Sequence, residues 1–434
     1  MLQFLKNHHY TAFVIYLLKW FLLSLVIGIF VGGASAFFLI SLKWCTIYRN
    51  ENPMIIWLLP IAGFAIGALY HYWGKSVVKG NNQIIDEYHS PTKIISFKMA
   101  PWVLIGTLGT HLFGGSAGRE GTAVQIGAAI ADQFSRFIKL ESLDRKTFLI
   151  MGISAGFAAV FGTPLAGAIF ALEVLLIGKI RFNALLPSIL VAIIADQSCL
   201  LFGGTHTNYI VNEIPNMTFK NLFFTIIAGV IFGLTGSLFA KGTHFWSNMF
   251  KKWFQYAPLR PVVGGLIIAI CVYLINTTRY IGLGVPVIVE SFSQSVPTYD
   301  FIVKLLFTTF TLGAGFKGGE VTPLFFVGAT LGNALVWFIP MPIPIMAAMG
   351  FVAVFAGATN TPIACTLMGI ELFGSETAQF IAVACFIAYL FSGHSGIYSS
   401  QIIGSVKHPI LQVEKGKLLS LIPSLRKEKK NPPQ

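Results

Sequence analysis

The stretch that decides the fold is GGSAGREGTAVQIGAA, residues 114–129. An arginine and a glutamate stand here among glycines, directly before a short apolar segment. The segment 122–137 has 16 residues before the charged run IKLESLDRK, and a helix of that length covers about 24 Å. Because a hydrocarbon core is roughly 30 Å thick, the sequence predicts an interrupted helix that ends inside the protein, at a site.

The composition around this stretch is that of an integral membrane protein. Of the 434 residues 55% are hydrophobic and only 11% are charged, and the mean hydropathy is +0.73. Long apolar runs recur along the chain, for example at 10–44 and 223–239. They are continuous and do not alternate with a period of two, which favours helices over a β-barrel. We therefore expect an all-α membrane protein with many tilted and broken helices.

The net charge of +13 fits the lysines and arginines that gather at the cytoplasmic ends of membrane helices. The last eleven residues, SLRKEKKNPPQ, form one short basic run without interleaved aromatic residues. Such a run is typical of a cytoplasmic C-terminus near anionic lipid and not of a nucleic-acid site. We therefore expect a multi-pass membrane protein in contact with lipid, with its C-terminus on the cytoplasmic side.

An internal repeat divides the chain into two related halves. GREGT at 118–122 and GGEVT at 318–322 share Gly, Glu and Thr, with the glutamates 200 positions apart. TPLAGAIFALE at 163–173 matches TPIACTLMGIE at 361–371 at an offset of 198. We place the first half at 1–210, the second at 211–404, and a short basic tail at 405–434.

Each half carries a glutamate at the glycine-rich start of an interrupted helix, Glu120 and Glu320. Unpaired amides and the positive end of the helix dipole favour a negative charge at such a position. In transporters built from two halves, interrupted helices point their N-termini at a shared site near the midplane. The carboxylate of Glu120 is therefore expected to occupy an anion site.

Three motifs resemble those of the CLC family of chloride channels and proton-coupled anion antiporters. They are GREG followed by VQIGAAIA, then GFKGGEVTPLFFVGATLGN at 315–333, and SGHSGIYSSQ at 392–401. The resemblance covers about residues 28–403. It implies a CLC-type fold of two inverted structural repeats, a homodimer, and an anion pathway in each subunit.

The resemblance also implies roles for individual residues. Glu120 matches the gating glutamate, which occupies the anion's place when charged and leaves it when protonated. Protonation releases the amides that the carboxylate and a small anion would otherwise compete for, so one residue can link the two movements. The anion-binding residues implied by these motifs are Asn81, Gly118, Gly121, Val321, Thr322 and Tyr398.

Departures from the chloride-selective pattern point to a particular branch. Asn81 in GNNQIIDE stands where those members carry serine, and Glu320, Val321 and Thr322 replace an apolar, a phenylalanine and an apolar residue. The inner glutamate of chloride/proton antiporters falls on Val174. These changes resemble the bacterial fluoride/proton antiporters. Fluoride holds water tightly, and an amide and a hydroxyl are the strong, close donors that can replace it.

The resemblance therefore implies a proton-coupled fluoride exporter of the bacterial inner membrane that confers fluoride resistance, with fluoride or chloride ions, protons and lipid as its partners. Two carboxylates beside one anion site repel each other and the substrate, so Glu320 is expected to hold a proton, to donate a hydrogen bond to fluoride, and to replace the proton route lost at Val174. The alternative within the same fold is a chloride/proton antiporter or a voltage-gated-type chloride channel.

Several candidate residues also allow a structural interpretation. Asn81 could be a helix-capping asparagine, and Tyr398 an interfacial aromatic. Arg119 could pair with Glu120 or anchor the helix. Glu173 and Glu371, at matched places in the two halves, could be structural carboxylates at a subunit interface or functional intramembrane charges.

The sequence disfavours protein classes other than transporters. The sequence has no HExxH motif and no pair of intramembrane histidines, since His111 and His394 lie far apart along the chain. We therefore expect neither an enzyme nor a bound metal or cofactor. A receptor or scaffold would not need duplicated broken helices.

Overall fold

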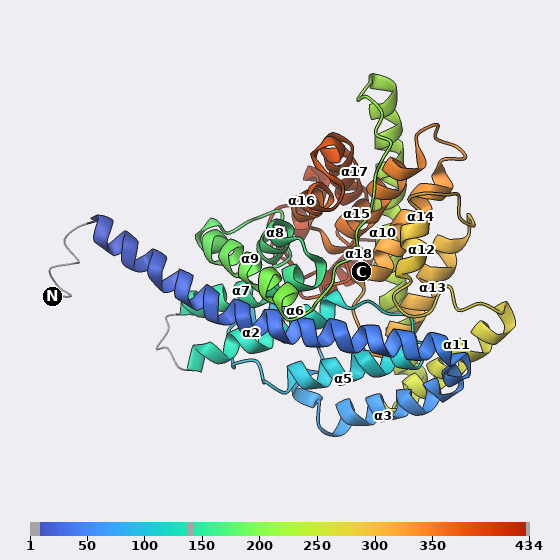
Figure 1. The fold of residues 1–434 in the computed structure, drawn as a ribbon, viewed down its shortest axis with the longest axis horizontal. Coiled ribbons are helices and arrows are strands. Elements are labelled where there is room, and N and C mark those ends of the chain that lie inside the picture. Colours follow the sequence, from blue (N-terminus) through green and yellow to red (C-terminus); the bar gives the residue numbers. More distant parts are fainter. Residues whose placement is uncertain (1–8, 137–141, 431–434) are drawn as a thin grey trace.

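The computed structural model describes residues 9–136 and 142–430, and the last four residues of the basic tail, 431–434, lie outside this part. Within the described residues, four helical stretches are long and apolar enough to cross a membrane: 13–51, 53–72, 182–201 and 219–253. The first and the last belong to the two longest helices, α2 (His9–Glu51) and α10 (Phe219–Trp253). Figure 1 shows α2 running lengthwise across the molecule, where it packs on α7 and α9.

The remaining elements are shorter. In chain order they are η1 (Pro53–Leu58), α3 (Leu59–Tyr72), η2 (Lys75–Val77), α4 (Asn81–His89), α5 (Met99–Leu112), α6 (Glu120–Gln133), η3 (Phe134–Arg136), α7 (Ser142–Phe161), α8 (Pro164–Glu173), η4 (Phe182–Ala184), α9 (Leu185–Leu201), α11 (Leu259–Ile275), α12 (Val285–Glu290), α13 (Asp300–Gly313), α14 (Val321–Leu335), α15 (Ile343–Thr359), α16 (Pro362–Phe373), η5 (Ser375–Thr377) and α17 (Ala378–Phe391). The C-terminal part adds η6 (Pro409–Glu414), η7 (Leu419–Leu421) and α18 (Ile422–Lys430). Strands β1 (Leu176–Ile177) and β2 (Ile402–Ile403) form one small parallel pair.

The interrupted helices predicted from the sequence are present. Helix α6 has 14 residues, so it spans about 21 Å. It begins at Glu120, two residues before the apolar segment, and it ends at Gln133, where a 3-10 turn follows. Its counterpart α14 has 15 residues. Both helices start at buried residues inside the bundle, Glu120 and Val321.

The two halves repeat the same helix pairs. Helix α7 packs on α6 through Gly127 and Gly152, and α15 packs on α14 through Gly328 and Gly350. In both pairs a methyl group on the first glycine would collide with the carbonyl oxygen of the second. Small residues therefore bring the two backbones into contact, which is a common way of packing membrane helices. The predicted boundary at 210 lies between α9 and α10.

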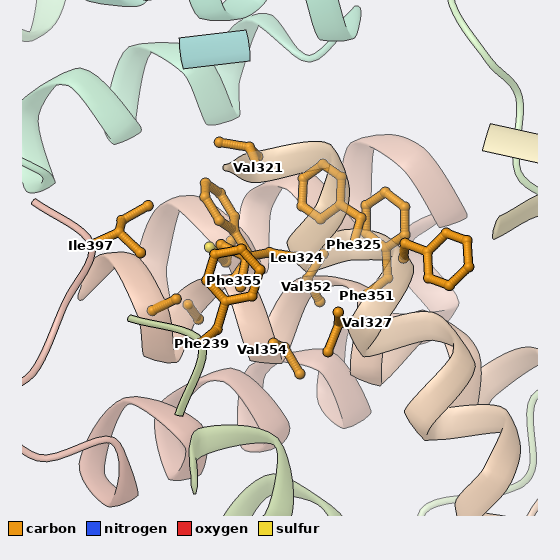
Figure 2. Packing of buried hydrophobic residues seen from close by; sticks show 14 of the residues in the cluster. Phe239, Val321, Leu324, Phe325, Val327, Phe351, Val352, Val354, Phe355 and Ile397 are labelled. Atoms are coloured by element: carbon orange, nitrogen blue, oxygen red, sulfur yellow. The ribbon is translucent and has the colours of Figure 1, made fainter. Parts of the chain in front are cut away.

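The core of the second half is a stack of aromatic rings between α14 and α15. Phe325 and Phe351 lie face to face with ring centroids 3.9 Å apart and an interplanar angle of 9°. Figure 2 shows these rings with Phe355, while Val321 and Ile397 lie toward its margin. This packing fixes the start of α14, which carries the candidate site.

The C-terminal segment folds back onto the bundle. Leu176 pairs with Ile402 and Ile177 with Ile403, and Leu419 and Ile422 complete a small buried cluster there. Lys407 donates its ammonium protons to Asn360 Oδ1, Ser392 Oγ and the carbonyls of Tyr389 and Gly393, at 2.6–2.9 Å. Together, these contacts hold the 392–401 loop, which contains Tyr398, between α17 and β2.

Candidate functional site

The starts of α6 and α14 meet through a short antiparallel backbone contact. The Gly118 amide donates to the Gly319 carbonyl at 2.6 Å, and the Gly319 amide donates to the Gly118 carbonyl at 2.8 Å. A methyl group on Gly118 would lie 2.9 Å from the Gly319 carbonyl oxygen, so the approach requires glycine. The two glutamates that the sequence singled out therefore lie on adjoining helix starts.

Glu120 reaches across this contact to the other half. Its buried carboxylate accepts the Thr322 hydroxyl at 2.5 Å on Oε1 and the Thr322 amide at 3.0 Å on Oε2. Oε2 also accepts the Arg119 amide at 3.1 Å. The carboxylate thus lies at the N-terminus of α14, where free amides and the helix dipole stabilise negative charge.

Glu120 also forms the ion pair with Arg119 that the sequence allowed. Arg119 Nε lies 3.5 Å from Glu120 Oε1, but it has no hydrogen-bond partner among the described residues. The shorter bonds to Glu120 come from Thr322. Arg119 therefore neutralises the carboxylate from the side, while Thr322 positions it.

Polar side-chain atoms of Glu320 and Asn81 both lie close to Gly121. Oε2 of Glu320 and Oδ1 of Asn81 are both buried, and neither has a hydrogen-bond partner in the described part of the chain. A methyl group on Gly121 would lie 2.9 Å from Asn81 Nδ2 and 3.6 Å from Glu320 Oε2. Buried polar atoms without partners are rare in folded proteins and call for an explanation, such as a ligand.

Asn81 is not a capping residue. The N-cap of α4 is Gly80, which has a φ of 56°, and no side chain caps this helix. A positive φ is readily adopted by glycine, so Gly80 makes the turn that brings Asn81 to the helix start. The capping interpretation of Asn81 is therefore wrong.

A cavity of about 210 Å³ opens beside these groups. It is lined by Asn81, Glu320 and Tyr398 together with the basic residues Lys79 and Lys317, and Tyr398 is only 5% exposed. Tyr398 is therefore not an interfacial aromatic. The remaining lining residues include Tyr70, Val78, Gly80, Gln125, His244, Gly318 and Ile397.

Val174 lies on the other side of Asn81 and Tyr398. These three residues line a narrow space of about 20 Å³, the Val174 space. Its other walls are the apolar side chains of Ile84, Ile85, Val124, Ile153 and Phe170. No carboxylate lines this space. A proton path through a side chain at position 174 is therefore not available, and Glu320 is the carboxylate that the larger cavity offers.

The structure brings all the predicted site residues to one region. Gly118, Gly121 and Glu120 come from the start of α6, Asn81 from α4 and Tyr398 from the 392–401 loop. Glu320, Val321 and Thr322 form the start of α14, where Val321 is buried. Their roles in binding an anion or moving a proton stay predictions.

Glu173 and Glu371 hold the two halves together. Glu173 accepts the amides of Ile363 and Ala364 at 3.2 and 2.9 Å. Glu371 accepts the amides of Leu165 and Ala166 at 2.9 and 2.8 Å. Each carboxylate therefore caps the first turn of the matching helix in the other half, α16 or α8, which supports the structural interpretation.

Two cations near the site were missed in the sequence analysis. Lys304 is fully buried and donates to the carbonyls of Tyr280 and Gly282 at 3.0 and 2.8 Å. The Gly282 amide in turn donates to the carbonyl of Gly115 in the opening stretch. A lone lysine in the apolar run FIVKLLFTTFTLG was the signal that could have identified it. The other missed cation is Lys317, inside the glycine-rich motif itself.

The chain is similar in sequence to known ion channel proteins. The family model described as voltage gated chloride channel matches residues 62–393. A chloride/fluoride channel protein from Pseudomonas syringae pv. tomato is 51% identical over 399 residues, which are 91% of this chain and 88% of that protein.

Solved structures show the same fold. The crystal structure of a CLC-type fluoride/proton antiporter has a TM-score of 0.86 and 36% identity, and the match covers 89% of this chain and 98% of that one. A slow cyanobacterial Cl⁻/H⁺ antiporter has a TM-score of 0.77 at 19% identity, covering 95% and 99%. The chain therefore belongs to the voltage gated chloride channel (CLC) family of membrane transport proteins, as its motifs predicted.

Proposed function

We propose that this protein exports fluoride from bacteria in exchange for protons across the plasma membrane, and that it thereby confers fluoride resistance. The observation that carries the proposal is the position of the Glu120 carboxylate, which accepts hydrogen bonds from the hydroxyl and the amide of Thr322. A small anion needs the same donors, so the carboxylate and the anion exclude each other.

The exchange follows from this competition. When Glu120 takes up a proton, it loses the charge that the Thr322 donors and Arg119 stabilise, and it can leave the start of α14. Fluoride then accepts the freed hydroxyl and amide. When Glu120 releases its proton, the carboxylate returns and displaces the anion, so a proton and an anion move in opposite directions.

The surroundings favour fluoride over chloride. Fluoride is small and strongly hydrated, so a site that strips its water has to offer strong donors at close range. Thr322 supplies a hydroxyl, and Asn81 brings its amide to Gly121. The names of the Pseudomonas relative and of the structural neighbour that is 36% identical both include fluoride, which supports this choice of substrate.

Glu320 supplies the second half of the proton route in this proposal. Its unpartnered Oε2 lies beside Gly121, and the Val174 space offers no carboxylate. A protonated Glu320 can donate a hydrogen bond to fluoride and carry the proton past the position at which Glu120 blocks the path. We further propose that the protein is not an enzyme, that it acts as a homodimer in lipid, and that its C-terminus is cytoplasmic.

The test is transport by purified protein in liposomes. Vesicles loaded with fluoride should release it, as followed by a fluoride electrode, faster when an inward proton gradient is imposed, and protons should enter at the same time. Glu120→Ala should abolish the dependence on the proton gradient. Release of chloride at an equal or higher rate would favour the chloride alternative and contradict the proposal.

A further inference from the structure

A second cavity adjoins the one beside Glu320. It has a volume of about 230 Å³ and lies between the end of α3 and the start of α11. Tyr70, Val78 and Lys317 line both cavities. These three side chains therefore form the wall between the two cavities, and Lys317 faces both of them.

Lys317 differs from two other lysines that lie within the protein, the buried Lys304 and the partly buried Lys407. Nζ of Lys304 and Nζ of Lys407 donate to two and to four oxygen atoms respectively. Lys317 Nζ lies 4.1 Å from the centre of the Tyr70 ring, and it forms no ion pair or hydrogen bond within the described ranges. An ammonium group has three protons to donate, so those of Lys317 are available to a ligand.

The stem of Lys317 is fixed in place. Its Cβ and Cγ atoms would each lie 2.9 Å from a methyl group on Gly106, so they pack directly on the backbone of α5. Tyr70 covers the ammonium group from the other side. A side chain held in this way loses little conformational entropy when it binds an ion, which makes it a preorganised contact.

The charges around the second cavity have one sign. Its ionised lining residues are Lys75, Arg260 and Lys317, and no acidic residue lines it. Lys251 also lies close enough to interact electrostatically with Lys317. A cleft lined by one sign of charge concentrates ions of the opposite sign and speeds their arrival.

We propose that the second cavity is an additional binding site for a small monovalent anion, with Lys317 as its principal ligand. The anion binds beside the Lys317 ammonium and then passes Tyr70 and Val78 to the cavity of Asn81, Glu320 and Tyr398. This inference rests on the proposed function, because it supplies the fluoride that the Glu120 site exchanges. Lys317 takes over part of the hydration of the ion before the tighter site strips the rest.

The first test is the dependence of fluoride flux on fluoride concentration in proteoliposomes. Lys317→Met keeps the bulk of the stem and removes the charge, so it should raise the half-saturating fluoride concentration about threefold or more, with the maximum rate within about twofold of wild type. Lys317→Arg should stay close to wild type. Lys415→Met, which removes an equal charge from an exposed site in the C-terminal segment, is the matched control.

Ionic strength separates a charge effect from a packing effect. An impermeant salt should raise the half-saturating concentration of wild type, since screening weakens the attraction, and it should have a smaller effect on Lys317→Met. A Lys317→Met variant with the half-saturating concentration and the salt dependence of wild type would overturn the proposal.

A binding measurement tests the site independently of transport. Crystals of the wild-type protein in bromide should show an anomalous peak within hydrogen-bonding distance of Lys317 Nζ, and the peak should vanish in Lys317→Met. If wild type fails to move fluoride but the peak is present, the proposed function fails and the second site stands. An occupied site at Glu120 with no peak at Lys317 would overturn the second site alone.

Discussion

Thr322 binds the carboxylate of Glu120 through two groups at once, its hydroxyl at 2.5 Å and its backbone amide at 3.0 Å. The two residues belong to different halves of the chain, 202 positions apart. The conformation of Glu120 therefore depends on how the second half presents the start of α14.

Replacing Thr322 with valine removes the hydroxyl and keeps the shape and the amide. A hydrogen bond to a charged group contributes about 1.5–3 kcal/mol, so we expect fluoride affinity to fall by roughly tenfold or more. Fluoride titration by calorimetry measures this. The matched control is Thr330→Val, since Thr330 is buried in the same helix but donates only to the carbonyls of Phe326 and Val327. Equal affinities in the two variants would contradict the role of the Thr322 hydroxyl.

Glu320→Gln should separate fluoride movement from proton movement. Glutamine keeps the shape and can donate a hydrogen bond to the anion, but it cannot release a proton. We expect fluoride binding within about threefold of wild type and proton uptake reduced by about tenfold or more. Parallel fluoride-electrode and pH recordings in liposomes give the ratio. Glu213→Gln, at an exposed position between α9 and α10, is the control, and an unchanged ratio in Glu320→Gln would reject the proton role.

Gly121→Ala tests whether the approach of Asn81 matters. The added methyl group would lie 2.9 Å from Asn81 Nδ2, so the amide has to move away. We expect fluoride flux to drop by roughly tenfold, while the protein still elutes as a folded species from a sizing column. Gly33→Ala is the control, because its methyl group would meet only Phe202 at an ordinary 3.5 Å. Loss of flux in both variants would mean that the effect is not specific to the site.

Glu173→Ala should lower the thermal stability of the protein. It leaves the amides of Ile363 and Ala364 without their acceptor at a buried helix start. An unsatisfied buried donor costs about 1–3 kcal/mol, so the unfolding temperature in detergent should fall by several degrees. Glu376→Ala, at an exposed position in η5, is the control. A melting temperature equal to that of wild type would show that the cap contributes little.

Acidification should loosen the C-terminal segment. The imidazole of His394 donates from Nδ1 to Glu414 at 2.5 Å and accepts the Lys407 amide on Nε2 at 3.3 Å, so the neutral ring satisfies both partners. Burial lowers the pKa of His394, although the bond with Glu414 opposes the shift. Burial acts to raise the pKa of Glu414, but the hydrogen bonds from Arg426 and His394 outweigh it and lower that pKa.

Both shifts act in the same direction. The unfolded segment takes up protons at a higher pH than the folded one, so stability is lost as the pH falls below about 6.5, the ordinary pKa of histidine. Hydrogen exchange of residues 402–430 should therefore be faster at pH 5.5 than at pH 7.5, after correction for intrinsic rates. In His394→Asn the difference should shrink. Equal protection at the two pH values in wild type would contradict this prediction.

The short helices and the location of the site were predictable because local signals carry them. Glycines beside Glu120 and Glu320, followed by a run of apolar residues too short to span a membrane, indicate an interrupted helix without any tertiary information. The repeated motif then indicated that the two glutamates occupy matched positions. The start of α6 at Glu120 agrees with the glycine-rich helix start expected there, two residues before the apolar segment.

Other features depended on contacts between distant segments. Glu173 and Glu371 have the same sequence context whether they face a subunit interface or the other half, and only the fold shows which amides they accept. The segment 405–434 was expected to be a short basic tail, yet its apolar residues Leu419 and Ile422 are buried in one cluster with Ile177. Lys317 was overlooked because glycines surround it, and a flanking lysine in a loop usually faces water.

The reciprocal caps of Glu173 and Glu371 bear on how such a chain could have arisen. A protein of half this length would expose one uncapped helix start and one unused carboxylate, each the complement of the other. Two copies in opposite orientation would satisfy both, so a half-length ancestor would have had to pair with a second copy to satisfy its helix starts. Joining two such copies in one chain would make that pairing permanent.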